Sequence, residues 1–193
     1  MIAGSARGRR LTVPDGDEVR PTKDMAREAL FSALDARGAI VDARVLDLYA
    51  GSGALAIEAL SRGADWATLV ERNRRAIEAI NANLDALGFE DRARVVAVDA
   101  ARITGSSIAV DAPFDLIFVD PPYTTSDADV DALLVGLMGP EWLAEDGIVS
   151  IERPTRHPIH PPPGCTTGWE RTFGDTLLTF CWRTSSEPGD STP

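Results

Sequence analysis

The stretch Asp120-Pro121-Pro122-Tyr123 carries the most distinctive chemistry in this sequence. It follows the apolar run 114–119, which is typical of a buried parallel strand. In open α/β sheets, ligands bind at the carboxyl ends of such strands. The Asp120 carboxylate and the Pro121 carbonyl can accept hydrogen bonds from one planar amino group, and Tyr123 can stack on the attached ring. These four residues therefore predict a catalytic turn that holds a planar amino group for reaction.

A second motif lies at the end of an earlier predicted strand, where Gly51 and Gly53 form a turn that opens a helix. Glycine lets the backbone approach a ligand closely, and a helix N-terminus offers free N–H groups. Residues 51–56 also match the dinucleotide fingerprint G-x-G-x-x-G/A, with Glu71 about twenty residues further on. This motif alone leaves two cofactor classes open, a dinucleotide and S-adenosylmethionine.

Acidic residues near the predicted strand ends favour S-adenosylmethionine. Asp47 can face an amino acid's ammonium group, Glu71 can accept both ribose hydroxyls, and Asp99 can accept the adenine amino group. A dinucleotide would place its pyrophosphate on the helix N-terminus and would leave Asp47 and Asp99 without a task. We therefore predict S-adenosylmethionine as the cofactor, with contacts from Asp47, Gly51, Gly53, Glu71 and Asp99.

The pattern around these motifs predicts a doubly wound, Rossmann-like α/β fold, because short apolar strands alternate with amphipathic helices. The predicted strands are 45–48, 66–70, 94–98, 114–119 and 148–151, and the predicted helices are 54–62, 74–87 and 127–138. The proline-rich stretch 153–164 predicts a surface loop. Two late strands, 166–171 and 176–183, predict an antiparallel end to a mostly parallel sheet.

The residues before this core predict a small extension. Residues 1–3 and 10–13 favour a short β-hairpin. Arg20-Pro21-Thr22 favours an extended link in which Thr22 caps a following helix. Residues 1–11 contain Arg7, Arg9 and Arg10 and no acidic residue. This local positive charge indicates either a patch that binds nucleic acid or a solvated hairpin.

The composition limits the classes of function. The chain has 193 residues, of which 44% are hydrophobic and 25% charged, as expected for about one globular domain. A net charge of -11 disfavours indiscriminate nucleic-acid binding, so any such role requires a local patch. No apolar run is long enough to span a membrane and the N-terminus has no apolar signal region, so we expect a cytoplasmic protein. The two cysteines and the pair His157 and His160 lack metal-ligand spacing, so we predict no metal site.

Several segments together resemble one family. They are Gly4 with Arg7-Gly8-Arg9-Arg10-Leu11, Arg20-Pro21-Thr22, residues 27–31, residues 47–53 and the turn at 120–123. In these segments the chain resembles the bacterial RsmD-type 16S ribosomal RNA (guanine-N2)-methyltransferases. The resemblance extends from Gly4 to about Arg183.

The resemblance implies an enzyme that methylates the N2 amino group of one guanine during assembly of the small ribosomal subunit. It implies RNA contacts from Arg7, Arg9, Arg10 and Arg20, and a Thr22 that closes over the cofactor. The expected partners are 16S rRNA within small-subunit particles and the ribosomal proteins beside it, and the expected state is a monomer. We expect an RNA-contacting extension at 1–37, a methyltransferase domain at 38–183 and a disordered tail at 184–193.

Three other functions remain open from the residues. The same catalytic turn suits an adenine N6-methyltransferase acting on DNA or RNA, because it recognises any planar amino group. The dinucleotide fingerprint leaves room for an NAD-dependent oxidoreductase. A non-catalytic RNA-binding assembly factor that keeps the fold is the third.

Overall fold

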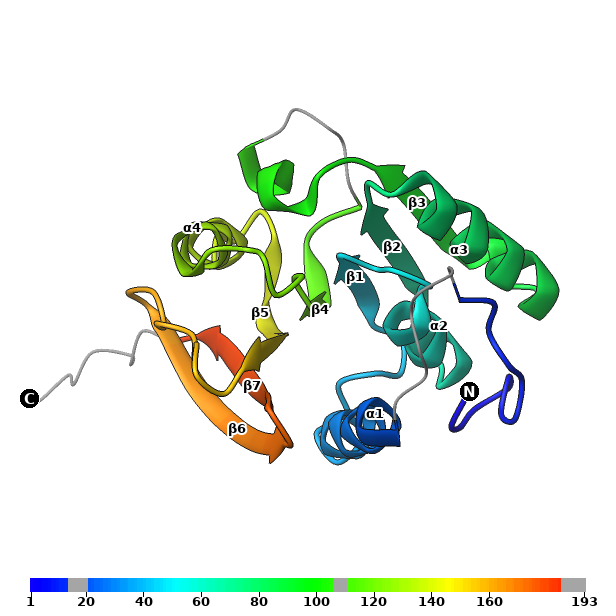
Figure 1. Ribbon diagram of the computed structural model, residues 1–193, viewed down its shortest axis with the longest axis horizontal. Helices are drawn as coiled ribbons and strands as arrows, with labels where there is room; N and C mark the ends of the chain where they lie inside the picture. Colours follow the sequence, from blue (N-terminus) through cyan, green and yellow to red (C-terminus); the bar gives the residue numbers. More distant parts are fainter. Residues whose placement is uncertain (14–20, 106–110, 185–193) are drawn as a thin grey trace, which may run out of the picture.

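Seven strands form one sheet in the order β3-β2-β1-β4-β5-β7-β6 (Figure 1). The computed structural model describes residues 1–13, 21–105 and 111–184, without the side chains of residues 21–23. The strands are β1 (Arg44–Leu48), β2 (Trp66–Glu71), β3 (Ala93–Ala97), β4 (Phe114–Val119), β5 (Leu143–Pro154), β6 (Cys165–Phe173) and β7 (Thr176–Arg183). Strands β1 to β5 pair in parallel, and β7 runs antiparallel to β5 and β6. The predicted doubly wound, mostly parallel sheet with an antiparallel last strand is confirmed.

Helices cover both faces of the sheet, because side chains alternate along each strand and bury one apolar set on each face. The helices are α1 (Pro21–Asp35), α2 (Ala54–Ser61), α3 (Arg74–Leu87) and α4 (Asp127–Leu137), with 3₁₀ turns η1 (Glu90–Arg92) and η2 (Ala100–Gly105). Helices α1, α2 and α3 share one core cluster with Val45, Leu69 and Phe118. Helix α4 and η2 share the second cluster with Leu48 and Val119 on the opposite face.

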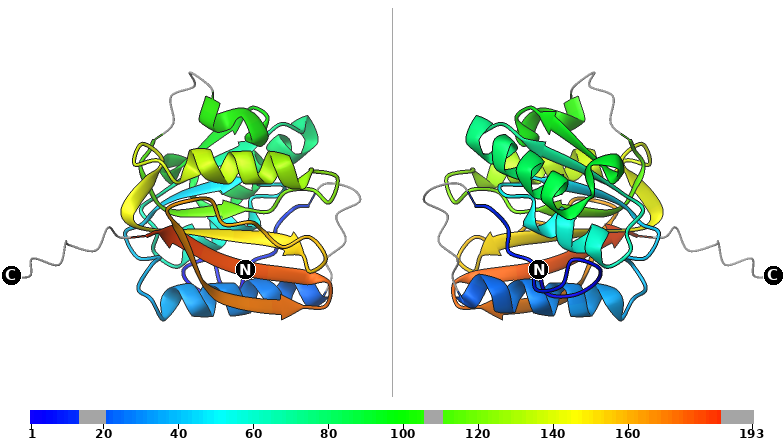
Figure 2. Two further views of the ribbon diagram at one scale, coloured as in Figure 1. Left: turned by 90° about the vertical axis from the view of Figure 1, so that its left-hand side faces the viewer. Right: turned by 90° about the vertical axis from the view of Figure 1, so that its right-hand side faces the viewer.

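The predicted N-terminal hairpin is wrong, since residues 1–13 contain no strand. The segment is a turn that lies against α2 (Figure 2). The fully buried Glu58 of α2 accepts the backbone N–H groups of Ile2 and Ala3 at 2.8 and 2.9 Å. Backbone donors that a hairpin would pair internally are therefore bonded to a helix side chain instead.

Close approach to α2 also explains the glycine at position 4. Gly4 has φ +75, and a Cβ built there would lie 1.8 Å from the Ser61 carbonyl oxygen. Ser61 Oγ accepts the Ala6 N–H at 2.9 Å and donates to the Ala3 carbonyl at 2.6 Å. The N-terminal segment is thus fixed to the same helix that follows the glycine turn.

Two element boundaries differ from prediction in ways that affect the site. Strand β5 extends to Pro154, so Arg153 lies in the sheet rather than in a surface loop. Arg153 is buried and pairs with Asp127 at the start of α4, which allows a charged residue inside the sheet. Helix α1 begins at Pro21, so Thr22 is helical rather than the residue before the helix. Proline suits a first helical position, where its missing N–H would have no helical partner.

Candidate active site

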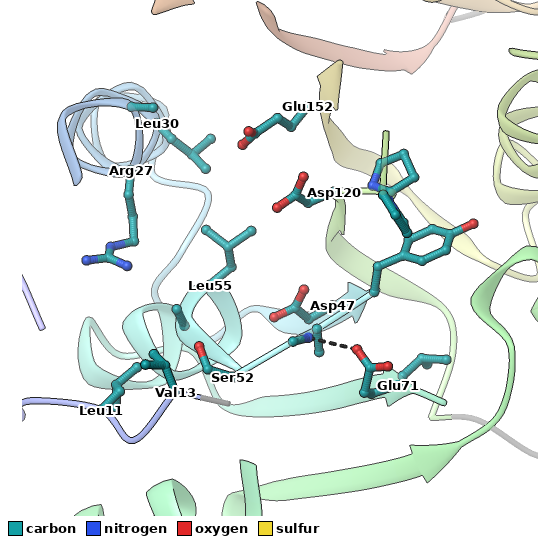
Figure 3. A pocket seen from close by; sticks show the side chains of 18 of the residues that line it. Leu11, Val13, Arg27, Leu30, Asp47, Ser52, Leu55, Glu71, Asp120 and Glu152 are labelled. Atoms are coloured by element: carbon teal, nitrogen blue, oxygen red, sulfur yellow. Dashed lines mark hydrogen bonds between the residues drawn. The ribbon is translucent and has the colours of Figure 1, made fainter. Parts of the chain in front are cut away.

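The carboxyl ends of β1, β2, β4 and β5 open into a pocket of about 900 Å³. Helix α1 and the N-terminal segment form its opposite wall (Figure 3). This is the edge of the sheet at which open α/β folds bind ligands. The pocket is lined by five acidic and four basic side chains: Asp24, Asp47, Glu71, Asp120, Glu152, Arg9, Arg10, Arg27 and Arg72.

All four residues of the predicted catalytic turn line this pocket. They follow the last residue of β4, and the Thr125 N–H donates to the Pro122 carbonyl at 2.9 Å to close the turn. The Tyr123 side chain is 64% exposed, so its ring stands at the mouth of the pocket. The turn thus presents a carboxylate inside the pocket and an aromatic surface at its entrance.

Asp47 of β1 is the most deeply buried acidic residue of the site, at 2% exposure. The pKa of Asp47 is raised to about 7, mainly by burial and in smaller part by the negative charges of Asp120 and Glu71. A hydrogen bond from the Ala56 N–H at 3.0 Å acts in the opposite direction. A nearby cation stabilises the ionised form of such a buried carboxyl group, so Asp47 is suited to bind a ligand's ammonium group.

The two glycines of the cofactor turn have different surroundings. Gly51 lines the pocket, has φ +57, and a Cβ there would meet only the Tyr49 carbonyl oxygen at 3.9 Å. Gly53 has φ +79 and faces the core, where a Cβ would lie 3.0 Å from Leu69 Cδ2. Gly51 therefore leaves room for a ligand, whereas Gly53 lets the chain enter α2 and is not among the residues that line the pocket.

Glu71 joins the glycine turn to the end of β2. Its Oε2 accepts the Gly51 N–H at 3.0 Å, and its Oε1 accepts the N–H groups of Arg72 and Asn73 at 2.8 Å each. The carboxylate lies in the pocket with its orientation fixed by these three donors (Figure 3).

Asp99 does not line the pocket, although its neighbour Ala100 does. Strand β3 ends at Ala97, and Asp99 follows two residues later. Its Oδ2 accepts a hydrogen bond from Arg72 Nη1 at 2.9 Å, and its Oδ1 accepts the Ala101 N–H at 3.2 Å. Asp99 therefore reaches the site through Arg72, which does line the pocket.

The predicted arginines are only partly at this pocket. Arg9 and Arg10 line it, and Arg9 Nη2 also donates to the Ala86 carbonyl of α3 at 2.8 Å. Arg7 is exposed and lies outside the lining. Arg20 lies outside the described residues, and so does the side chain of Thr22.

A single buried amide joins the N-terminal segment to the glycine turn. Asn83 Oδ1 accepts the Thr12 N–H at 2.7 Å, and Asn83 Nδ2 donates to the carbonyls of Thr12 and Ser52 at 2.9 and 3.0 Å. Sequence reasoning missed Asn83, because an asparagine inside a helix gives no sign of a partner so distant along the chain.

Arg27 and Glu152 also line the pocket and were not predicted as site residues. Arg27 Nη2 donates to Asp24 at 2.7 Å, and its buried Nε has no hydrogen-bond partner in the described part of the chain. Glu152 follows the run 148–151 as Asp120 follows the run 114–119, so the same strand-end reasoning could have found it. Helical spacing puts Arg27 on one face with Leu30, three positions on, but does not show that this face meets the pocket.

Both histidines lie beside acidic residues of α4. His157 Nδ1 lies 3.0 Å from Asp127, and His160 Nδ1 lies 3.4 Å from Asp131. Residues 1–13, 21–105 and 111–184 contain no group of three or more metal-ligating side chains. None of the helices in these ranges is long and apolar enough to cross a membrane.

Comparison with known proteins identifies the family. Residues 1–182 match the family model described as Conserved hypothetical protein 95. Ribosomal RNA small subunit methyltransferase D of Escherichia coli strain K12 is 40% identical over 152 residues, which are 79% of this chain and 73% of the relative. The chain belongs to the RsmD-type methyltransferase family. The resemblance seen in the sequence is therefore confirmed.

Two solved structures share the fold of this chain. The Escherichia coli protein yhhF superimposes with a TM-score of 0.80 at 34% identity, covering 95% of this chain and 96% of its own. A methyltransferase structure complexed with SAH has a TM-score of 0.68 at 16% identity, covering 86% of this chain and 50% of its own. At that identity the second likeness shows the fold alone.

Proposed function

We propose that this chain is an S-adenosylmethionine-dependent methyltransferase that acts on the N2 amino group of one guanine in 16S rRNA, within the small ribosomal subunit or its assembly intermediate. The observation that carries the proposal is that Asp47 and Asp120, on neighbouring strands β1 and β4, line one pocket. Asp47 suits the cationic amino acid moiety of the cofactor, and Asp120 suits a planar amino group of the substrate. Family membership and the name of the Escherichia coli relative support ribosomal RNA as the substrate.

The residues at the ends of β1 and β2 fit S-adenosylmethionine. Asp47 would face the ammonium group, Glu71 would accept ribose hydroxyls with its oriented carboxylate, and Gly51 would let the backbone come close. Asp99 would act on the adenine side together with Arg72. Gly53 would contribute through the shape of the turn, and Thr22 from the first turn of α1. When bound, the cofactor supplies a methyl group on a positively charged sulfur.

The catalytic turn would make the target nitrogen a better nucleophile. The N2 lone pair of guanine is delocalised into the ring, so the nitrogen must be drawn toward tetrahedral geometry before it reacts. Asp120 and the Pro121 carbonyl would accept its two N–H groups, Pro122 would fix the turn, and Tyr123 would stack on the base. As the nitrogen–methyl bond forms and the sulfur–methyl bond breaks, one proton leaves N2 for Asp120 or for water.

RNA would approach over the N-terminal segment. Arg9 and Arg10 stand at the pocket and Arg7 is exposed beside them, which gives a local positive patch on a chain of net charge -11. Arg20 completes the proposed set of phosphate contacts. Ribosomal proteins of the particle would add contacts that an acidic protein needs.

The test uses small-subunit particles from a strain that lacks the gene. The purified protein and a donor with a labelled methyl group should label one guanine, and digestion of the RNA should locate the label at N2. Labelling only on adenine N6 would exclude guanine and favour the adenine methyltransferase. In calorimetry, a heat of binding for NAD with no heat of binding for S-adenosylmethionine would favour the oxidoreductase.

A further inference from the structure

Asp120 directly follows the last residue of β4, and Glu152 lies beside it within the adjacent parallel strand β5. Val119 of β4 pairs with Ile151 of β5, and each acidic residue is the next one along the chain. Neighbouring strands are about 4.8 Å apart. Both side chains line the pocket, and Figure 3 shows their carboxylates directed into the same space, across from Leu30 of α1.

The backbone of Glu152 is held by strand β7. Glu152 pairs with Leu178 of β7, between the pairs formed by Ile151 and Arg153. The side chain of Arg153 is buried on the opposite face of the sheet, where it pairs with Asp127. A residue held in this way can position a carboxylate reproducibly, as recognition of a base edge requires.

The edge of the base decides what such a neighbour can recognise. Guanine carries an N1–H donor directly beside its N2 amino group, whereas 2-aminopurine carries a lone pair at N1 beside the same amino group. An ionised carboxylate only accepts hydrogen bonds, so it attracts the N1–H of guanine and repels an N1 lone pair. If Asp120 holds the amino group, as the proposed function requires, the adjacent carboxylate faces N1.

We propose that Glu152 is the residue that selects guanine, by accepting the N1–H of the base whose N2 amino group lies on Asp120. This inference rests on the proposed function and adds the base-reading contact to it. Adenine presents an acceptor at N1 next to its own amino group, so Glu152 would oppose adenine at the same turn. Two adjacent carboxylates thus favour the base edge with two adjacent donor groups.

The test measures methyl transfer to small-subunit particles assembled with a synthetic RNA segment that carries guanine or 2-aminopurine at the target position. The unchanged protein should prefer guanine by about 10- to 100-fold in kcat/KM. Glu152→Gln should lower the rate on guanine by a similar factor and leave 2-aminopurine unchanged or faster, because the new amide can donate to N1. The ratio of the two substrates is the readout that a purely structural role would not move.

Glu145→Gln, on an exposed part of the same strand, is the matched control and should leave both rates unchanged. Binding of S-adenosylmethionine and the melting temperature check that Glu152→Gln folds, and Glu152→Asp should recover part of the preference for guanine. An equal loss on both substrates would overturn the role of Glu152 while leaving the proposed function in place. A protein that labels no guanine even when unchanged would overturn both.

Discussion

Burial raises the pKa of Asp47 and the negative charge of Asp120 adds to the rise, so the proposed cofactor and substrate halves of the pocket are electrostatically joined. Leu48 of β1 pairs with Val119 of β4, which brings the two carboxyl groups to the same edge of the sheet. A cation between them would relieve the repulsion. The site is therefore arranged for a positively charged ligand before the acceptor base arrives.

Affinity for S-adenosylmethionine should depend on pH through Asp47. Its pKa is raised to about 7 in the free protein, and a ligand ammonium would favour the ionised form, so binding releases a proton at lower pH. We expect the dissociation constant to rise about tenfold between pH 8 and pH 6. Calorimetry in buffers of different ionisation enthalpy measures both effects. Asp47→Asn should bind weakly with little pH dependence, and a steep dependence in that variant would assign the proton elsewhere.

The stability of the ligand-free protein should change with pH for the same reason. The pKa of Asp47 is raised from 3.8 to about 7, so the folded state favours the protonated group. This contribution is complete below the unfolded pKa and is lost as pH rises toward 7. Asp47→Asn should therefore gain up to about 4 kcal/mol in free energy of unfolding at pH 8 and little at pH 4. Urea unfolding tests this, with Asp85→Asn on the exposed face of α3 as the control.

Removing the catalytic carboxylate should separate chemistry from binding. Asp120→Ala should lower turnover about 100-fold or more, because it deletes an acceptor aimed at the reacting nitrogen. Cofactor affinity should largely persist, since Asp47 and Glu71, the residues proposed to contact the cofactor, are unchanged. Single-turnover assays and calorimetry measure the two quantities. If the only effect of Asp120→Ala were a loss of RNA binding, Asp120 would be an RNA contact and not the catalytic acceptor.

The N-terminal arginines should determine the salt dependence of RNA binding. Changing Arg7, Arg9 and Arg10 to alanine should weaken binding and flatten the slope of log affinity against log salt by about 0.7 to 0.9 for each phosphate that is no longer neutralised. Arg171→Ala on the edge strand β6 is the matched control. An unchanged slope in the triple variant would remove this segment from the RNA interface. Arg9→Ala alone should also loosen the segment, because Arg9 bonds to Ala86.

Asn83→Ala should affect both halves of the pocket at once. It removes the amide that holds Thr12 and Ser52, and the loss of these part-buried hydrogen bonds should cost about 1 kcal/mol. We expect weaker binding of both S-adenosylmethionine and RNA, with faster hydrogen exchange at Thr12. Exchange that rises at Thr12 while cofactor affinity stays constant would show that the two segments are independent.

The core of the fold was predictable because its strands and helices have local apolar periodicity. The catalytic turn was predictable for a related reason, since Asp120 follows a recognisable strand and the register of parallel strands places strand ends together. The end of strand β5 was predicted too early, because Arg153 and Pro154 open a proline-rich stretch that predicts a loop, and the partner of Arg153, Asp127, is distant in the sequence.

The N-terminal segment was not predictable from its own residues. Its shape depends on Glu58, 56 positions after Ile2, and on Asn83, 71 positions after Thr12. No local pattern reports such partners, and a glycine followed by arginines and an apolar run suggested a hairpin instead. Arg27 was missed as a site residue for the same reason, since its place at the pocket follows from how α1 packs and not from α1 itself.

The attachment of residues 1–13 to α2 and α3 sets an order of events during translation. This segment is synthesised before the groups that hold it, Glu58, Ser61 and Asn83. Until then the arginines have no folded surface to lie on, so the surface proposed to bind RNA forms only once the glycine turn and its two helices have formed. The part of the chain that contains the glycine turn therefore folds before the proposed RNA-binding surface is assembled.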